Sequence, residues 1–468
     1  MSVFNKLNSF FRLFKQAING DTQDYTSGSI DKAIILLSIP MILEMSMESL
    51  FAVIDVYFVS QLHDNDAVAT VGLTESVLTL IYALAMGLSM GATAMVARRV
   101  GEKDIKAAEV AAIQAIYIGL GLSLFITVIG MFFSEDILRL MGASELLIEK
   151  NSGYTRWMFT GNITIMLLFL TNGVFRGAGD ASIAMRSLLL ANGLNIFLDP
   201  IFIFGAGPIP AFGVEGAAIA TNIGRGIGVS YQMYHLFRGK GLIKLHAQNV
   251  TVVWNIIGRL VNVSAGGTGQ FLIGSASWIF LVRILSDFGS TAVAGYTIAI
   301  RVIVFAILPA WGMANAAATL VGQNLGAGYP ERAEKSVWRT AFFNMVFLAV
   351  ITLLFFSLAR PIIQLFTTDE LVLKIGIQCL KIVSLGYIFY AYGMVVGQSF
   401  NGAGDTRTPT IISFFGFWML QIPMAYALAN WLGAGTDGVF SAIPIAESLM
   451  AVAYILLFRK GKWKATKI

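Results

Sequence analysis

The sequence predicts an all-α membrane protein in which about twelve transmembrane helices form two lobes of six helices each. The 468-residue chain is 56% hydrophobic and only 13% charged, whereas a soluble protein carries about twice that share of charged residues. The charged residues are segregated, which leaves apolar runs of about 20 residues or more, the length that crosses a bilayer as a helix. One six-residue phrase also occurs twice, half a chain apart.

The apolar runs predict helices, because lipid tolerates only helices or closed barrels and the alternation typical of barrel strands is absent from the sequence. The predicted spans are 33–60, 68–96, 107–133, 153–175, 183–205 and 213–237 in the first half, then 253–285, 291–318, 336–359, 375–399, 408–431 and 438–458 in the second.

The repeated phrase indicates that the two halves arose by duplication. Phe-Arg-Gly-Ala-Gly-Asp at 175–180 recurs as Phe-Asn-Gly-Ala-Gly-Asp at 400–405, a shift of 225 positions. An even number of predicted spans separates the copies, so both face the same side of the membrane. The lobes are therefore expected to be related by a pseudo-two-fold axis along the membrane normal.

Basic residues mark the cytoplasmic side of a membrane protein. They gather in the N-terminal segment, after the second span, in the mid-chain connector and in the tail, while the intervening loops lack them. This predicts a multi-pass protein of the cell (inner) membrane with both termini in the cytoplasm. We divide the chain into a cytoplasmic amphipathic segment (1–32) that lies along the bilayer, the N-terminal lobe (33–237), a cytoplasmic linker (238–252), the C-terminal lobe (253–458) and a basic tail (459–468).

Composition argues against several other functions. The net charge of +5 follows from the loop asymmetry, so no nucleic-acid partner is expected, and we expect a monomer. The single cysteine, Cys379, and three scattered histidines form no metal-binding pattern, and no cofactor is expected. A serine-hydrolase-like phrase at 87–91 lies in an apolar span without a nearby histidine, which favours helix packing over an enzyme. No phosphate-binding loop supports ATP-driven transport.

Ionisable residues in the membrane are costly and usually functional. Glu44, Glu48 and Asp55 fall within about 40° of one another on the first predicted span. Three carboxylates on one face cannot all be charged and unpaired at low dielectric, so we expect them to bind cations, to take up protons, or both.

The predicted fifth and sixth spans carry further polar groups. These are Asn192, Asn195 and Asp199, followed by Pro200, and then Thr221 and Arg225. Carboxylate, amide and hydroxyl oxygens suit a hard cation such as sodium and equally suit a proton relay, while Arg225 could neutralise one acid. The alternative is that these groups only hold helices together. The second half offers amides instead, with Gln270 and Gln421 as cavity candidates.

At these positions the chain resembles the multidrug and toxic compound extrusion (MATE) family. Phe51-Ala-Val-Ile-Asp55 after Pro40 resembles the family's first span, Asn195-Ile-Phe-Leu-Asp199-Pro200 its fifth and Gly216-Ala-Ala-Ile-Ala-Thr221 its sixth; the paired Gly-Ala-Gly-Asp phrases also match. The resemblance implies a two-lobe exporter that moves organic cations outward in exchange for inward sodium or protons. It further implies that Asp55, Asn195, Asp199 and Thr221 bind the coupling cation and that Pro40 kinks the first helix.

Two points stay open. Some family members carry acids in the seventh and tenth spans, whereas here Gln270 occupies the first region and no carboxylate lies between Ile375 and Ser399; coupling through the first lobe is therefore favoured, with sodium and protons both possible. A flippase for a lipid-linked oligosaccharide or another lipid is the alternative function, although an anionic headgroup calls for basic residues in the cavity. A passive channel is a further rival.

Overall fold

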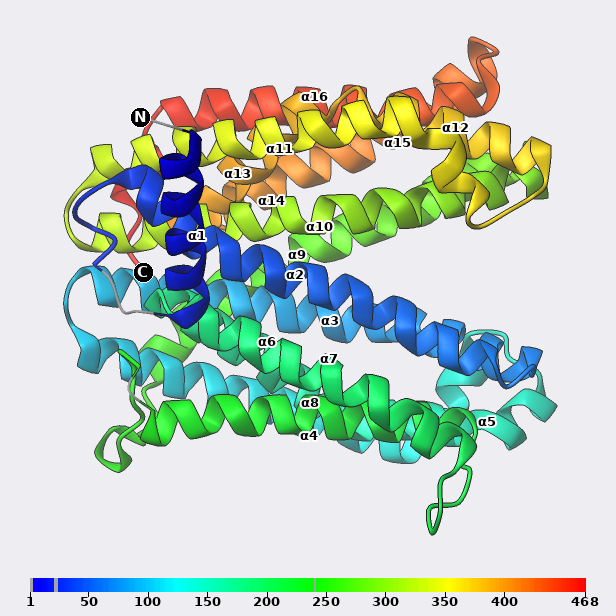
Figure 1. Cartoon of the computed structure of the whole chain (residues 1–468), viewed down its shortest axis with the longest axis horizontal. Coiled ribbons are helices and arrows are strands. Elements are labelled where there is room, and N and C mark those ends of the chain that lie inside the picture. Colours follow the sequence, from blue (N-terminus) through cyan, green and yellow to red (C-terminus); the bar gives the residue numbers. More distant parts are fainter. Residues whose placement is uncertain (1–2, 21–23, 240) are drawn as a thin grey trace. The chain divides into compact units, whose positions relative to one another are not determined.

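The computed structural model describes the backbone of residues 3–20, 24–239 and 241–468. It describes their side chains except those of residues 3–10, 51–53, 55, 56, 65 and 247. Within these residues the structure is helical and contains no strand, only an isolated bridge between Ala206 and Ile209. The prediction of an all-α fold is confirmed (Figure 1).

The helices follow the predicted spans closely. The first half contains α1 (Val3–Asn19), α2 (Ile30–Ser60), α3 (Asn65–Gly101), α4 (Ile105–Leu140), α5 (Glu145–Thr160), α6 (Asn162–Ala178), α7 (Ala181–Phe204) and α8 (Val214–Arg238). The second half contains η1 (Ala247–Asn249), α9 (Trp254–Ser286), α10 (Ser290–Gly326), α11 (Pro330–Gln364), α12 (Glu370–Ser384), α13 (Tyr387–Ala403), α14 (Arg407–Phe414), η2 (Phe415–Gln421), α15 (Ile422–Tyr426), η3 (Ala427–Trp431), α16 (Gly435–Arg459) and η4 (Lys462–Ala465).

Ten helical stretches of the described chain are long and apolar enough to cross a membrane, and the bent pair α12 and α13 makes an eleventh. The polar α8, which carries Thr221 and Arg225, is not among them. Three predicted spans are less regular than expected. The fourth is divided into α5 and α6 at Gly161, and the tenth into α12 and α13, which meet at 58°. The eleventh contains the π-helical stretches η2 and η3 on either side of α15, which begins at Ile422 with Pro423, a residue without a backbone N–H.

The chain divides into two compact units whose boundaries fall inside helices. Unit 1 comprises residues 1–14, 24–42 and 269–468, and unit 2 comprises 15–23 and 43–268. The beginning of α2 therefore belongs with unit 1 and the rest with unit 2, and α9 passes from unit 2 to unit 1 after Thr268. Pro40 lies inside α2, which continues as one helix through it, two residues before this boundary.

The repeated phrase is a helix terminator in both units. Gly179 and Gly404 cap α6 and α13 with φ of 85° and 89°, a left-handed conformation that glycine adopts without steric cost. The next residue closes the turn, because the Asp180 N–H donates to Phe175 and the Asp405 N–H donates to Phe400. The phrase thus recurs because two equivalent helices must each stop abruptly.

The first glycine of each phrase allows two helices to pack closely. A Cβ at Gly177 would lie 2.7 Å from the carbonyl oxygen of Thr93 on α3, and one at Gly402 would lie 2.2 Å from that of Ala318 on α10. Both contacts are shifted by the same 225 positions as the phrases. The duplication seen in the sequence is therefore also a duplication of packing within each unit.

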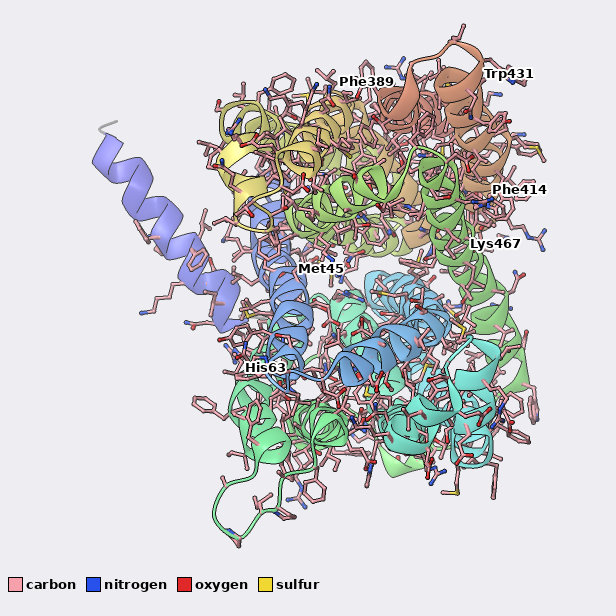
Figure 2. All side chains as sticks on the ribbon, turned by 90° about the vertical axis from the view of Figure 1, so that its right-hand side faces the viewer. Met45, His63, Phe389, Phe414, Trp431 and Lys467 are labelled. Atoms are coloured by element: carbon pink, nitrogen blue, oxygen red, sulfur yellow. The ribbon has the colours of Figure 1, made fainter. Side chains whose placement is uncertain are left out.

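Large apolar side chains cover much of the outer surface, as a bilayer requires. Figure 2 shows Phe389, Phe414 and Trp431 on the outside of unit 1, and Trp431 is 78% exposed. The same view labels Met45 on α2 and His63 in the turn after it. The chain is a multi-pass membrane protein.

Candidate ion and substrate sites

The predicted polar groups of α7 and α8 come together in the interior of unit 2. Asp199 and Asn195 are 0% and 1% exposed, and Thr221 is 3% exposed. The Asn195 Nδ2 donates to Asp199 Oδ1 at 2.9 Å and lies 3.4 Å from Thr221 Oγ1. The Asn195 amide nitrogen therefore bridges the Asp199 carboxylate and the Thr221 hydroxyl between two adjacent helices, while the Asn195 oxygen has no hydrogen-bond partner among the described residues.

Two backbone features place these side chains. Gly224 of α8 lets that helix approach α7, since a Cβ there would lie 2.8 Å from the Ala191 carbonyl oxygen. Pro200 follows Asp199 within α7 and cannot donate the usual helical hydrogen bond, which leaves a carbonyl one turn back without that donor. The side chain of Asp55, the fourth predicted member of the site, lies outside the described residues; its backbone belongs to α2.

The secondary candidates occupy the same unit. Asn192 is nearly buried, and its Nδ2 donates to the Met47 carbonyl oxygen at 2.9 Å, which ties α7 to α2. Arg225 is also buried; its Nη2 donates to the Tyr82 hydroxyl at 2.9 Å and its guanidinium lies 5.7 Å from the Tyr82 ring centre. Glu48 interacts electrostatically with Arg225 and stays partly exposed.

Glu44 has a different environment from Glu48, although both lie on the same stripe of α2. Its carboxylate is 0% exposed, and Oε1 lies 3.2 Å from Nη1 of Arg176, the arginine of the first repeated phrase. The Arg176 Nη2 donates to Ser89 Oγ on α3 at 2.7 Å. Glu44 thus joins α2 to α6 and, through Arg176, to α3.

Gln270 occupies the corresponding place in unit 1. It exchanges two amide hydrogen bonds, of 3.0 and 3.1 Å, with Asn401 of the second phrase. Asn401 lies 225 positions after Arg176, and Gln270 lies 226 positions after Glu44. The contacts therefore identify Glu44, rather than Glu48, as the structural counterpart of Gln270. Gln421, the other amide candidate, is buried on η2, and its side-chain oxygen has no hydrogen-bond partner among the described residues.

One acidic residue was overlooked in the sequence. Glu447 lies midway along α16 in unit 1 and interacts electrostatically with the tyrosines Tyr390 and Tyr454. An acid in the middle of the predicted span 438–458 was the signal that could have identified it. Among the described residues, no group of three or more histidine, cysteine or acidic side chains could hold a metal ion.

Comparison with known proteins decides the family. A family model described as MatE matches residues 40–201 and 269–427. The chain belongs to the MATE family. The two matched stretches include every predicted site residue except Thr221 and Arg225, which lie on α8.

Individual MATE relatives match over almost the whole chain. The probable multidrug resistance protein NorM of Thermotoga maritima is 27% identical over 436 residues, which cover 93% of each chain. The FAD transporter of Shewanella oneidensis is 25% identical over 442 residues, 94% of this chain and 97% of that protein. A crystal structure of MATE in the straight conformation superposes with a TM-score of 0.89 at 28% identity, covering 95% of this chain and all of that one. The predicted resemblance to the MATE family is confirmed.

Proposed function

We propose that this MATE protein is a multidrug efflux antiporter. It exports organic, mostly cationic compounds in exchange for inward sodium or protons. The observation that carries the proposal is the buried cluster of Asn195, Asp199 and Thr221, in which an acid, an amide and a hydroxyl lie together on α7 and α8. Relatives whose names describe multidrug resistance support the substrate class.

The finer architecture belongs to the same proposal. Twelve spans result when α8 is counted with the ten apolar stretches and the bent pair α12 and α13. Both termini would then lie on one side, in the cytoplasm, and the protein would act in the cell membrane as a monomer. The two halves would form six-helix lobes that alternately open a central path to either side.

The exchange would depend on the charge of the unit 2 cluster. A sodium ion or proton that reaches Asp199 cancels its negative charge and draws the Asn195 and Thr221 oxygens toward one centre. Asn192 passes this change to α2 through its bond to the Met47 carbonyl, and α2 can bend near Pro40. Antiport requires substrate and cation to disfavour each other's bound state by about 1–3 kcal/mol.

The decisive experiment is transport of a fluorescent organic cation in proteoliposomes under a sodium gradient and, separately, under a proton gradient. Wild-type protein is expected to drive uphill export with at least one of the two gradients. Asp199→Asn keeps the size of the side chain and removes its charge, so we expect at least a tenfold loss of gradient-driven export. Asp136→Asn, at an exposed position of α4, is the matched control and should transport as wild type does.

Folding must be separated from coupling in this test. Both variants should elute as single peaks and unfold within a few degrees of the wild-type protein. Undiminished uphill export by Asp199→Asn would refute the proposed ion site. Export that continues without any gradient would instead refute antiport and favour a passive channel.

The substrate class has one specific competitor. A relative at 25% identity is named as an FAD transporter, and FAD is an anion rather than a cation. Export of a labelled flavin nucleotide or of a labelled anionic lipid precursor, with no export of organic cations, would replace the multidrug assignment.

A further inference from the structure

Glu447 is a carboxylate inside the membrane without a counter-charge. It lies at the midpoint of α16, and neither a salt bridge nor a hydrogen bond to its side chain occurs among the described residues. A carboxylate at this depth costs several kcal/mol unless something offsets its charge. An acid in this environment is therefore expected to have a functional partner that is not part of the chain.

The face of α16 that carries Glu447 points away from lipid. The exposed apolar residues of this helix lie about 140–180° around the helix axis from Glu447; they are Ile445, Leu449, Val452 and Leu456. Tyr454 lies about 20° from Glu447, on the same face. Glu447 itself is partly exposed.

Helix α13 packs directly against this face. A Cβ at Gly386 would lie 2.6 Å from Pro444 Cβ, and one at Gly393 would lie 3.0 Å from Ala451 Cβ. These close contacts occur one turn before and one turn after Glu447. They bring Tyr390, which lies between the two glycines on α13, within electrostatic range of the carboxylate.

Two tyrosines lie within electrostatic range of the acid, and one of them connects it to further aromatic rings of unit 1. Tyr390 interacts with the side chain of Trp311 on α10, and the Trp311 ring centre lies 5.4 Å from that of Phe271 on α9. The Tyr454 hydroxyl donates to the Pro409 carbonyl oxygen at 3.4 Å, which fixes its ring. Within the described part of the chain, Glu447 forms no salt bridge, and its electrostatic partners on α13 and α16 are tyrosines.

We propose that Glu447, together with Tyr390, Trp311 and Tyr454, forms a binding subsite for an organic cation inside unit 1. The carboxylate supplies the opposite charge, and the ring faces attract a cation whose charge is spread over a large apolar body. Such a ligand loses little hydration free energy when it enters the subsite, whereas a small metal ion would lose much more. The subsite rests on the proposed function, since it names where part of the exported substrate binds.

Binding of ethidium to purified protein in detergent, followed by fluorescence anisotropy without any gradient, tests the subsite. Glu447→Gln should weaken ethidium binding at least tenfold and leave binding of the neutral dye Nile red within threefold of wild type. Glu447→Asp, which keeps the charge, should retain most of the ethidium affinity. Glu370→Gln, an exposed acid of the same unit that pairs with Arg360, should change neither ligand.

The aromatic part of the subsite has its own variants. Tyr390→Phe keeps the ring and should bind ethidium nearly as wild type does, whereas Tyr390→Leu should weaken binding at least threefold. If Glu447→Gln fails to fold, wild-type protein can be labelled at membrane carboxylates with dicyclohexylcarbodiimide. Bound ethidium should then protect Glu447 from labelling, as measured by peptide mass spectrometry.

The outcomes separate this inference from the proposed function. Two results would overturn the subsite alone, provided that the wild-type protein exports ethidium. One is unchanged ethidium binding by Glu447→Gln; the other is labelling of Glu447 that ethidium does not reduce. Failure of the wild-type protein both to bind and to export ethidium would overturn the subsite and the cationic substrate class together. Loss of gradient coupling in Asp199→Asn with normal ethidium binding supports both.

Discussion

Glu44 and Arg176 form a buried ion pair of 3.2 Å between α2 and α6, and the same place in unit 1 is held by the uncharged pair of Gln270 and Asn401. In each unit the pair connects two elements. One is the helix that crosses the unit boundary, which is α2 for the first pair and α9 for the second. The other is the repeated phrase, which ends α6 or α13. Glu44 and Gln270 each lie two residues beyond the boundary between the units. The contact between Glu44 and Arg176 depends on charge, whereas the contact between Gln270 and Asn401 does not.

The neutral pair predicts how the charged pair can be replaced. Glu44→Gln or Arg176→Asn alone should lower the free energy of unfolding by about 3–5 kcal/mol, because each leaves a buried charge without its partner. The double variant reproduces the pair found in unit 1 and should recover most of that loss. Thermal unfolding and efflux of all four proteins form a double-mutant cycle; a double variant no better than the worse single one would contradict the prediction.

Gly173 of α6 is expected to tolerate no side chain. A Cβ there would lie 2.4 Å from the Ser89 carbonyl oxygen of α3, so Gly173→Ala must push the two helices apart at a cost of about 1–3 kcal/mol. Gly193→Ala is the control, since a Cβ at that helical position meets nothing within 4 Å. The melting temperature should fall for the first variant and stay level or rise for the second.

Two arginines of α11 are expected to hold the segment that leads into α2, within unit 1. Arg332 donates to the carbonyl oxygens of Tyr25, Ser27 and Gly28, and Arg339 binds Asp31. Their joint replacement by alanine should speed backbone hydrogen exchange in residues 24–33, measured by mass spectrometry. Arg360→Ala, which removes an exposed ion pair near the other end of α11, should leave exchange in this segment unchanged; equal exchange in all proteins would contradict the assignment.

The pH dependence of stability should include a contribution from Asp180, in the turn between α6 and α7. Burial raises the pKa of its carboxyl above the ordinary value of 3.8, against the lowering effects of the Ser182 hydroxyl and Arg186. The folded protein therefore binds this proton more tightly than the unfolded chain, and stability falls as the pH rises above about 4 until the folded pKa is passed. Asp180→Asn removes this contribution.

A melting-temperature series from acidic to neutral pH tests this sign. The wild-type protein should lose more stability over the series than Asp180→Asn does. Parallel curves for the two proteins would show that Asp180 does not titrate differently on folding. Asp136→Asn at an exposed site serves as the control for a general change in charge.

Much of the fold was predictable because apolar length and loop charge are local properties of the chain. The ends of α7, predicted at 183 and 205, differ from the structure by two residues or fewer. Irregular helices were not predictable. The break at Gly161 and the π-helical turns around α15 depend on how neighbouring helices pack, because a glycine or a proline in an apolar run does not by itself specify a break, as Pro40 and Pro200 show.

The site shows the same division. Helical spacing sufficed to place Asn195 near Asp199, because residues four apart share a face. It could not reveal that Glu44 pairs with Arg176, since these residues are 132 positions apart and meet only after α2 and α6 pack. An acid in the apolar span 438–458 was itself a signal for Glu447, but the tyrosines near it become apparent only after α13 and α16 pack.

Apolar run length, basic loops and the repeated phrase are properties of the linear chain, and they are enough to define a helical membrane protein with two duplicated halves. Tertiary structure decided which charges are neutralised and which are available, because the energy of a carboxylate in a membrane depends on the partners that distant helices bring to it. Glu44 receives an arginine, Asp199 receives the amide of Asn195, and Glu447 receives aromatic rings.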